Sequence, residues 1–217
     1  MKKYIMLACE ILKDEIMHII RESPVDYPIY FISSELHLHP EKLREFLQET
    51  IDQIENVDYI LLPLGRCGNG TVGLVSQNAT LVIPKSEDCI NLLLSDQSLK
   101  VERPSKSSFF TKGWLQNKHT AANHEYLNTV EKFGKEQADM LTKIMYSAYE
   151  HFTLVNTGAY DMKEAYDLLT PLASVIPIEI NEIPGKCGVL KKMLQLDLDD
   201  NFIFIAPGEK VQEKDFM

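Results

Sequence analysis

Hydrophobic residues in the first part of the chain form short continuous runs, and amphipathic stretches separate them. The runs lie at 3–9, 29–33, 58–64 and 79–83. Between them, apolar residues recur every three or four positions, which is helical spacing, at 10–21, from His39 onward, and more briefly at 72–75 and 88–94. Continuous apolar strands are typical of a parallel sheet covered on both faces. The pattern predicts alternating strands and helices.

The same alternation returns later in the chain. An irregular polar segment at 98–120 precedes a long helical pattern at 121–150 that is interrupted near Gly134. Further strands and helices are predicted at 152–156, 161–175, 177–182, 186–196 and 201–206. We predict an α/β fold with an open, mostly parallel sheet and helices on both faces. Its organisation is either one continuous domain or two similar lobes, 1–120 and 121–217.

Net charge and composition limit the classes of partner that the protein is expected to bind. The chain has 217 residues and a formal net charge of −10, which argues against non-specific nucleic-acid binding and against docking on an anionic membrane. No run approaches the roughly 18 apolar residues of a membrane-spanning helix. Charged residues return at Glu10, so we interpret the apolar start as a buried strand and expect a cytoplasmic protein. Its four cysteines are then expected as thiols or ligands, not disulfides.

Cysteine and histidine residues follow four consecutive predicted strands. Cys9 ends the first strand, and the others are His37, Cys67 and Cys89. Because ligands of parallel sheets bind at the carboxyl edge, we expect these side chains to converge there. Thiolates and imidazole suit zinc, and three cysteines suit an iron–sulfur cluster equally well. Any one of these cysteines alone is equally explained as a small buried hydrophobic residue, and we interpret Cys187 in this way.

Two acids flank the predicted ligands. Glu10 follows Cys9 and Asp88 precedes Cys89. We predict that they act as proton carriers beside an open coordination position. For Asp88, a role at the start of a helix, where the helix dipole favours acids, explains the residue equally well.

Glycines surround Cys67 in the sequence GRCGNG. Gly65, Gly68, Asn69 and Gly70 match neither the P-loop nor the dinucleotide-binding pattern. We predict that they let the backbone approach a bulky group held on Cys67, such as a metal cluster or a tetrapyrrole.

An aromatic segment at 105–125 is predicted to cover this edge of the sheet as a lid. Its aromatic and histidine residues are Phe109, Phe110, Trp114, His119 and His124.

Several motifs resemble those of the domain-of-unknown-function family 1638. They are ACEIL, ELHLHPEKLREFL, ILLPLGRCGNGTVGL, LVIPKSEDCINLLL, FFTKGW and FIAPG. The resemblance matches Cys9, His37, Cys67 and Cys89 to motif positions. It implies a protein of anaerobic bacteria and methanogenic archaea, encoded near corrinoid-dependent methyltransferases. No D-x-H-x-x-G corrinoid-binding signature is present in the sequence.

Three hypotheses for function follow. The first is a metal-dependent protein with a zinc or iron–sulfur site, acting in corrinoid or methyl-group metabolism, for example as a methyltransferase. The second is a non-catalytic module that holds a corrinoid, haem or metal for methyltransferase components. The third is a metal-free protein whose cysteines only pack. We expect a small-molecule ligand or corrinoid methyltransferase components as partners.

Overall fold

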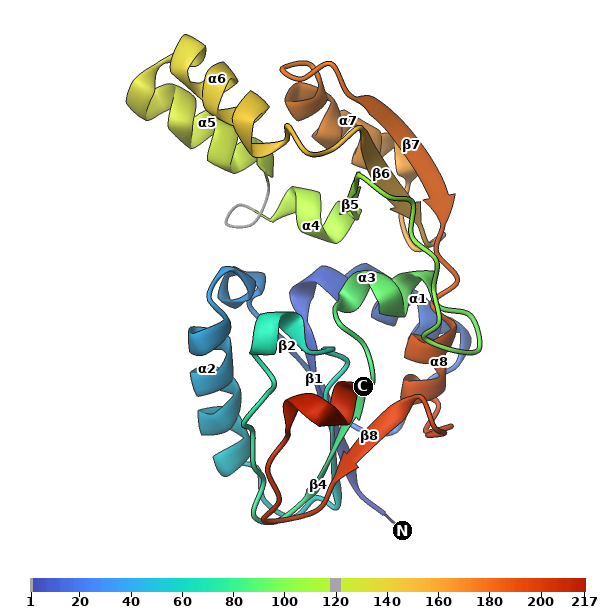
Figure 1. Ribbon diagram of the computed structural model, residues 1–217. Coiled ribbons are helices and arrows are strands. Elements are labelled where there is room, and N and C mark those ends of the chain that lie inside the picture. Colours follow the sequence, from blue (N-terminus) through green and yellow to red (C-terminus); the bar gives the residue numbers. More distant parts are fainter. Residues whose placement is uncertain (1, 118–121) are drawn as a thin grey trace. The chain divides into compact units, whose positions relative to one another are not determined.

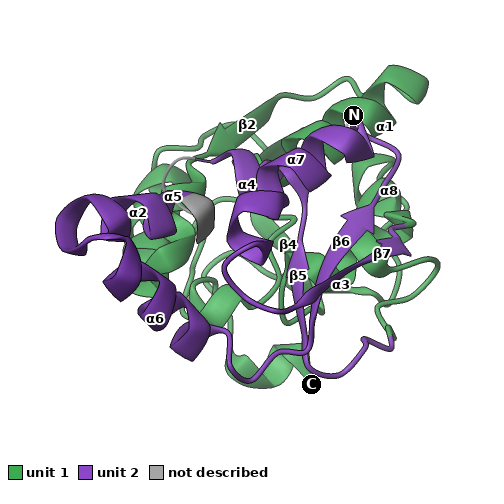
Figure 2. Ribbon diagram, turned by 90° about the horizontal axis from the view of Figure 1, so that it is seen from above, with its two compact units in different colours: residues 1–101, 186–217 green, residues 102–185 purple. Residues whose placement is uncertain are grey.

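The chain folds into two compact units. The computed structural model describes residues 2–117 and 122–217. Unit 1 comprises Met1–Val101 and Lys186–Met217, and unit 2 comprises Glu102–Gly185 (Figure 2). This division differs from the predicted lobes 1–120 and 121–217 because the last part of the chain returns to unit 1.

Unit 1 is built on a five-stranded sheet with the order β2-β1-β3-β4-β8. The strands are β1 (Tyr4–Cys9), β2 (Ile29–Ile32), β3 (Tyr59–Leu61), β4 (Thr80–Pro84) and β8 (Phe202–Ile205). The first four are mutually parallel, and β8 pairs antiparallel with β4. Consecutive residues Met6 and Leu7 of β1 are both at most 1% exposed, so this interior strand is buried on both faces. The predicted mostly parallel α/β architecture is confirmed.

Helices cover both faces of this sheet (Figure 1). They are α1 (Lys13–Glu22), α2 (Pro40–Asp52), α3 (Cys89–Leu94) and α8 (Gly188–Leu194). The connection through α1 runs from β1 outward to β2, and the connection through α2 crosses back over β1 to β3. Right-handed crossovers in opposite directions place their helices on opposite faces. Helix α8 packs with α1 and α3.

Two predicted helical segments differ from the structure. The stretch 10–21 begins as the 3₁₀ turn Glu10–Leu12 before α1. No helix forms at 72–75. Instead, the backbone there exchanges hydrogen bonds with Val211, which donates to the Leu74 carbonyl at 3.0 Å and accepts from Gly73 at 2.9 Å. Pairing with this distant segment uses the groups that a helix would need.

Unit 2 is a smaller α/β unit with a three-stranded parallel sheet in the order β5-β6-β7. Its elements are β5 (Ser107–Phe110), α4 (Lys112–Gln116), α5 (Ala122–Phe133), α6 (Lys135–Met145), β6 (His151–Asn156), α7 (Met162–Ala173) and β7 (Glu179–Pro184). Gly134, with φ of +82°, separates α5 from α6 at the predicted interruption. The described part of the predicted irregular segment, 98–117, is more regular than predicted, because Phe110 and Phe152 pack edge to face and anchor β5 in a core.

Among the described helices of both units, none has the length and apolar character needed to cross a membrane.

Candidate functional site

Cys9 and Cys67 lie where the strand order of the sheet reverses. The chain leaves β1 toward β2 and leaves β3 in the opposite direction, toward β4. Cys9 is the last residue of β1, and Cys67 lies in the loop that follows β3. In open α/β sheets, neighbouring connections that diverge in this way leave a crevice in which ligands bind. The two cysteines therefore occupy the place in unit 1 where the fold favours a site.

The structure brings a third thiol, Cys89, into the same neighbourhood. Cys9, Cys67 and Cys89 are 7%, 8% and 9% exposed. Burial raises the pKa of Cys67 to about 12, and the nearby Cys9 raises it further. Burial also raises the pKa of Cys89 well above its usual value, with added contributions from Cys67 and Cys9. Thiols that influence one another electrostatically must lie near one another.

Glu10 connects Cys9 to the turn that carries His37. Burial raises the pKa of Cys9 to about 11, a backbone hydrogen bond from Ile11 opposes this, and the Glu10 carboxylate raises it again. Glu10 also accepts a hydrogen bond of 3.3 Å from the backbone N–H of Ser34, which begins the 3₁₀ turn Ser34–Leu38. The carboxylate thus lies between the end of β1 and the histidine turn.

His37 and Asp88 extend the site. His37 is half-buried, and this burial lowers its pKa while the charge of Asp88 raises it. The Asp88 carboxylate accepts a hydrogen bond of 3.1 Å from the backbone N–H of Asn91 and so caps α3. The helix-start role for Asp88 is therefore realised. The same carboxylate also affects the imidazole and the thiols of Cys67 and Cys89.

The turn around Cys67 has an unusual backbone. Cys67, Gly68 and Asn69 have φ values of 48°, 62° and 73°, all left-handed. For residues other than glycine, this conformation costs about 1–2 kcal/mol each. The Cys67 N–H donates to the Glu87 carbonyl at 3.0 Å, and the Gly70 N–H donates to the Cys67 carbonyl at 3.1 Å. These bonds hold the strained turn against the segment that leads into Cys89.

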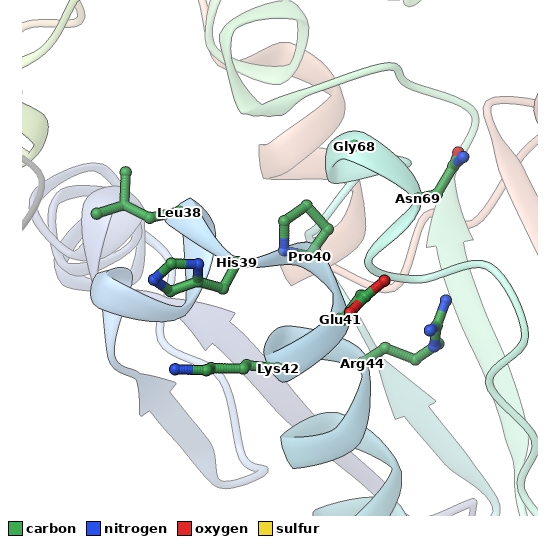
Figure 3. A pocket seen from close by; sticks show the side chains of 8 residues that line it. All are labelled: Leu38, His39, Pro40, Glu41, Lys42, Arg44, Gly68 and Asn69. Atoms are coloured by element: carbon green, nitrogen blue, oxygen red, sulfur yellow. The ribbon is translucent and has the colours of Figure 1, made fainter.

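Glycines in this loop allow close packing within unit 1. A Cβ at Gly65 would overlap the carbonyl oxygen of Ser86, and a Cβ at Gly70 would stand 2.8 Å from a methyl group of Leu43. Gly68 and Asn69 are exposed instead and line an open pocket of about 530 Å³ beside the start of α2 (Figure 3). Contact of these four residues with a cofactor stays a prediction, because packing already accounts for Gly65 and Gly70.

Cys187 lies apart from the three clustered thiols. It directly precedes α8, is 7% exposed and has a φ of 52°. Burial raises its pKa to about 12, and the acid that adds to this is Glu15 of α1. Its surroundings are those of a packing residue, in line with the interpretation from the sequence.

The predicted lid residues that the structure describes belong to unit 2. Phe110 is buried in the core of unit 2 and Trp114 packs against that core, so unit 2 alone explains their burial. Phe109 lies under the guanidinium of Arg103, 5.6 Å from its ring centre. The His124 ring contacts the Asn128 amide at 3.0 Å. His119 lies outside the described residues. A lid role for 105–125 stays a prediction.

Within residues 2–117 and 122–217, no group of three or more histidine, cysteine, aspartate or glutamate side chains is arranged so that it would hold a metal ion.

Comparisons with known proteins place the chain in a family without an assigned activity. No curated protein matches it. A solved structure titled "Crystal structure of a small-chain dehydrogenase" covers 87% of this chain and 100% of its own, at 10% identity and a TM-score of 0.22, which is too low to support any argument. A family model described as "Protein of unknown function (DUF1638)" matches residues 31–194, which include His37, Cys67 and Cys89, and the chain therefore belongs to this family.

Proposed function

We propose that the protein binds a metal through the thiolates of Cys9, Cys67 and Cys89, and that the metal serves chemistry or ligand binding. The observation that supports this proposal is that three buried thiols follow three separate strands of one sheet, that Cys9 and Cys67 lie at its switch point, and that both affect the pKa of Cys89. The metal is zinc or the iron of a cluster, since sulfur ligands suit both.

Charge gives the physical reason for a cation at this place. Each thiol has a pKa raised by burial, and its neighbours among the three raise the pKa of Cys67 and Cys89 further. Three ionised thiolates would therefore repel one another. A bound cation replaces that repulsion with attraction, and its binding releases the thiol protons. The proposal includes a rotation of the side chains toward a common ion.

The ligands' places in the fold favour a functional metal over a structural one. Structural zinc sites usually clamp short loops through closely spaced ligands. Here the ligands come from separate strand ends of a unit whose strands already bury apolar side chains such as Met6, Leu61 and Val82. Three thiolates leave a fourth position on the metal, which His37 or a substrate would take.

Methyl transfer is the more specific form of the proposal. A thiolate bound to zinc remains a nucleophile at neutral pH, which suits alkyl transfer. The alternative is a non-catalytic module that holds a corrinoid, haem or metal for a partner enzyme. Burial lowers the pKa of His37, which favours the neutral imidazole that an axial ligand requires.

Metal content of protein purified without oxygen tests the proposal. The matched pair of variants is Cys67→Ser and Cys187→Ser, because the two cysteines share burial, left-handed backbone and raised pKa. We expect Cys67→Ser to weaken metal binding at least about 100-fold and Cys187→Ser to leave it unchanged. Iron with equal sulfide identifies a cluster, and equimolar zinc without colour identifies a zinc thiolate.

Two outcomes would contradict the proposal. Wild-type protein that binds neither added zinc nor a reconstituted cluster has only packing cysteines. Equal metal loss from both variants shows that the site is elsewhere. A melting temperature that hardly changes on metal removal supports a functional metal, whereas a large fall makes the metal structural.

A further inference from the structure

An open pocket adjoins the Cys67 turn. It has a volume of about 530 Å³ and lies between the exposed Gly68 and Asn69 and the first turn of α2 (Figure 3). Gly68 and Asn69 directly follow Cys67 in the left-handed turn, so the pocket lies next to the turn that carries this candidate ligand. This volume falls within the range of small-molecule sites.

The charged side chains around this pocket carry a positive excess. Lys42 and Arg44 line it together with a single acid, Glu41. Neither cation is engaged in an ion pair with any residue of the described chain. The chain as a whole has a net charge of −10, so a pocket lined by two cations and one acid contrasts with the rest of the protein.

Arg44 is held in a defined place. It is half-buried, and a Cβ at Gly73 would stand 3.6 Å from its Cδ, so the loop at Gly73 supports the aliphatic part of the side chain. Figure 3 shows Arg44 and Asn69 on one side of the pocket, and Lys42 with His39 on the other. A guanidinium fork binds the paired oxygens of a carboxylate or phosphate, and a lysine adds a point charge.

We propose that this pocket binds a small carboxylate- or phosphate-bearing ligand through Arg44, with Lys42 adding positive charge from the opposite side. The Asn69 carboxamide supplies an additional hydrogen-bond donor from the turn. Bound beside Cys67, the ligand would have its uncharged part near the metal site. The role of the pocket as a substrate subsite rests on the proposed metal function, whereas anion binding itself does not.

Titration of the metal-free protein with inorganic phosphate and, separately, with succinate tests the proposal by amide NMR. We expect saturable shifts at residues 38–44 and 68–69 with at least one anion, and the tighter of the two identifies phosphate or carboxylate as the recognised group. Arg44→Gln should weaken binding at least tenfold, and Arg44→Lys, which keeps the charge without the fork, should weaken it less. Arg21→Gln removes an equal charge from an exposed position of α1 and should have no effect.

Either of two results would overturn the inference: wild-type protein without saturable shifts for both anions, or equal binding by Arg44→Gln and Arg21→Gln. Repeating the titration with Cys67→Ser separates the two proposals. Anion binding that persists in this variant while metal binding is lost supports both. If the wild type binds metal but neither anion, only the pocket proposal is overturned. If it binds an anion but no metal, only the metal-site proposal is overturned.

Discussion

Cys67 and Cys187 are alike in their burial, their left-handed backbone conformation and their raised pKa. They are 8% and 7% exposed, have φ values of 48° and 52°, and have pKa values raised to about 12, mainly by burial. Each cysteine also has a nearby glycine that packs closely against the backbone of another loop. Gly65 packs against Ser86, and Gly188 packs against Asp96. Burial, backbone strain and glycine therefore do not distinguish a candidate site from a packing position.

Their neighbours distinguish them. The next largest influence on Cys67 is another thiol, Cys9, and Cys67 in turn affects Cys89. The corresponding influence on Cys187 is the buried carboxylate of Glu15. Soft ligands gathered from separate strands have a use in metal binding, whereas a single buried thiol is a common packing residue. The following predictions test this distinction, beginning with the largest effect.

Replacing Gly65 or Gly188 with alanine should destabilise the protein strongly. A Cβ at Gly188 or Gly65 would overlap a carbonyl oxygen of Asp96 or Ser86, and backbone cannot move aside cheaply. We expect Gly188→Ala and Gly65→Ala to lower the free energy of unfolding by about 3 kcal/mol or more, measured by chemical denaturation. Gly134→Ala serves as the comparison for backbone strain without overlap: nothing lies within 4 Å of its Cβ position, but its φ of +82° disfavours a side chain, so we expect a smaller loss of about 1–2 kcal/mol. A loss at Gly134 as large as at the other two would show that overlap costs no more than backbone strain.

Replacing His37 should weaken the proposed metal site without affecting the surroundings of Cys187. His37→Ala removes the candidate fourth ligand, and we expect metal affinity to fall about 10- to 100-fold in a competition with a chelator. His18→Ala is the matched control, since His18 lies on α1 and pairs with Glu22 at 3.7 Å. Equal affinities of the two variants would exclude His37 as a ligand.

Alkaline pH should destabilise the metal-free protein in part through Cys187. Its thiol has a pKa near 9 when unfolded and about 12 when folded, so the native state keeps its proton to higher pH. The stabilisation that this thiol contributes is fully present below about pH 9. The free energy of unfolding then falls as the pH rises toward 12, by up to about 1.4 kcal/mol per pH unit for this group. Denaturation curves between pH 8 and 10.5 should show a smaller fall for Cys187→Ala than for wild type. Parallel curves would contradict the burial of this thiol.

Asp88 should have two separable roles of modest size. Asp88→Ala removes the cap of α3 and should cost about 1 kcal/mol, as should Asp161→Ala at the start of α7. Asp88→Asn keeps a capping oxygen but removes the charge that raises the pKa of His37. We therefore expect Asp88→Asn to lower that pKa in an NMR titration at nearly unchanged stability. An unchanged His37 titration would place Asp88 too far from the imidazole.

Most elements of unit 1 could be predicted because each strand is a continuous apolar run and each helix has its own signals. Pro40 begins α2 and Asp88 caps α3, both at the predicted positions. The stretch 72–75 was predicted as a helix because nothing local reveals its pairing with residues near Val211. The return of the last residues to unit 1 has no local signal either, since β8 joins the first sheet across more than a hundred residues of chain.

The sequence by itself determined the alternation of strands and helices and the placement of Cys9, Cys67 and Cys89 after strand ends, because hydrophobic spacing and residue type are local properties. Only the tertiary structure decided that Cys9 and Cys67 follow adjacent strands that diverge, since strand order depends on contacts between distant segments. It also decided that Gly65 serves close packing against Ser86, and that Cys187 lies with Glu15 instead of the other thiols. Both depend on which loops the folded sheet brings together, and local patterns along the sequence do not reveal contacts between distant segments.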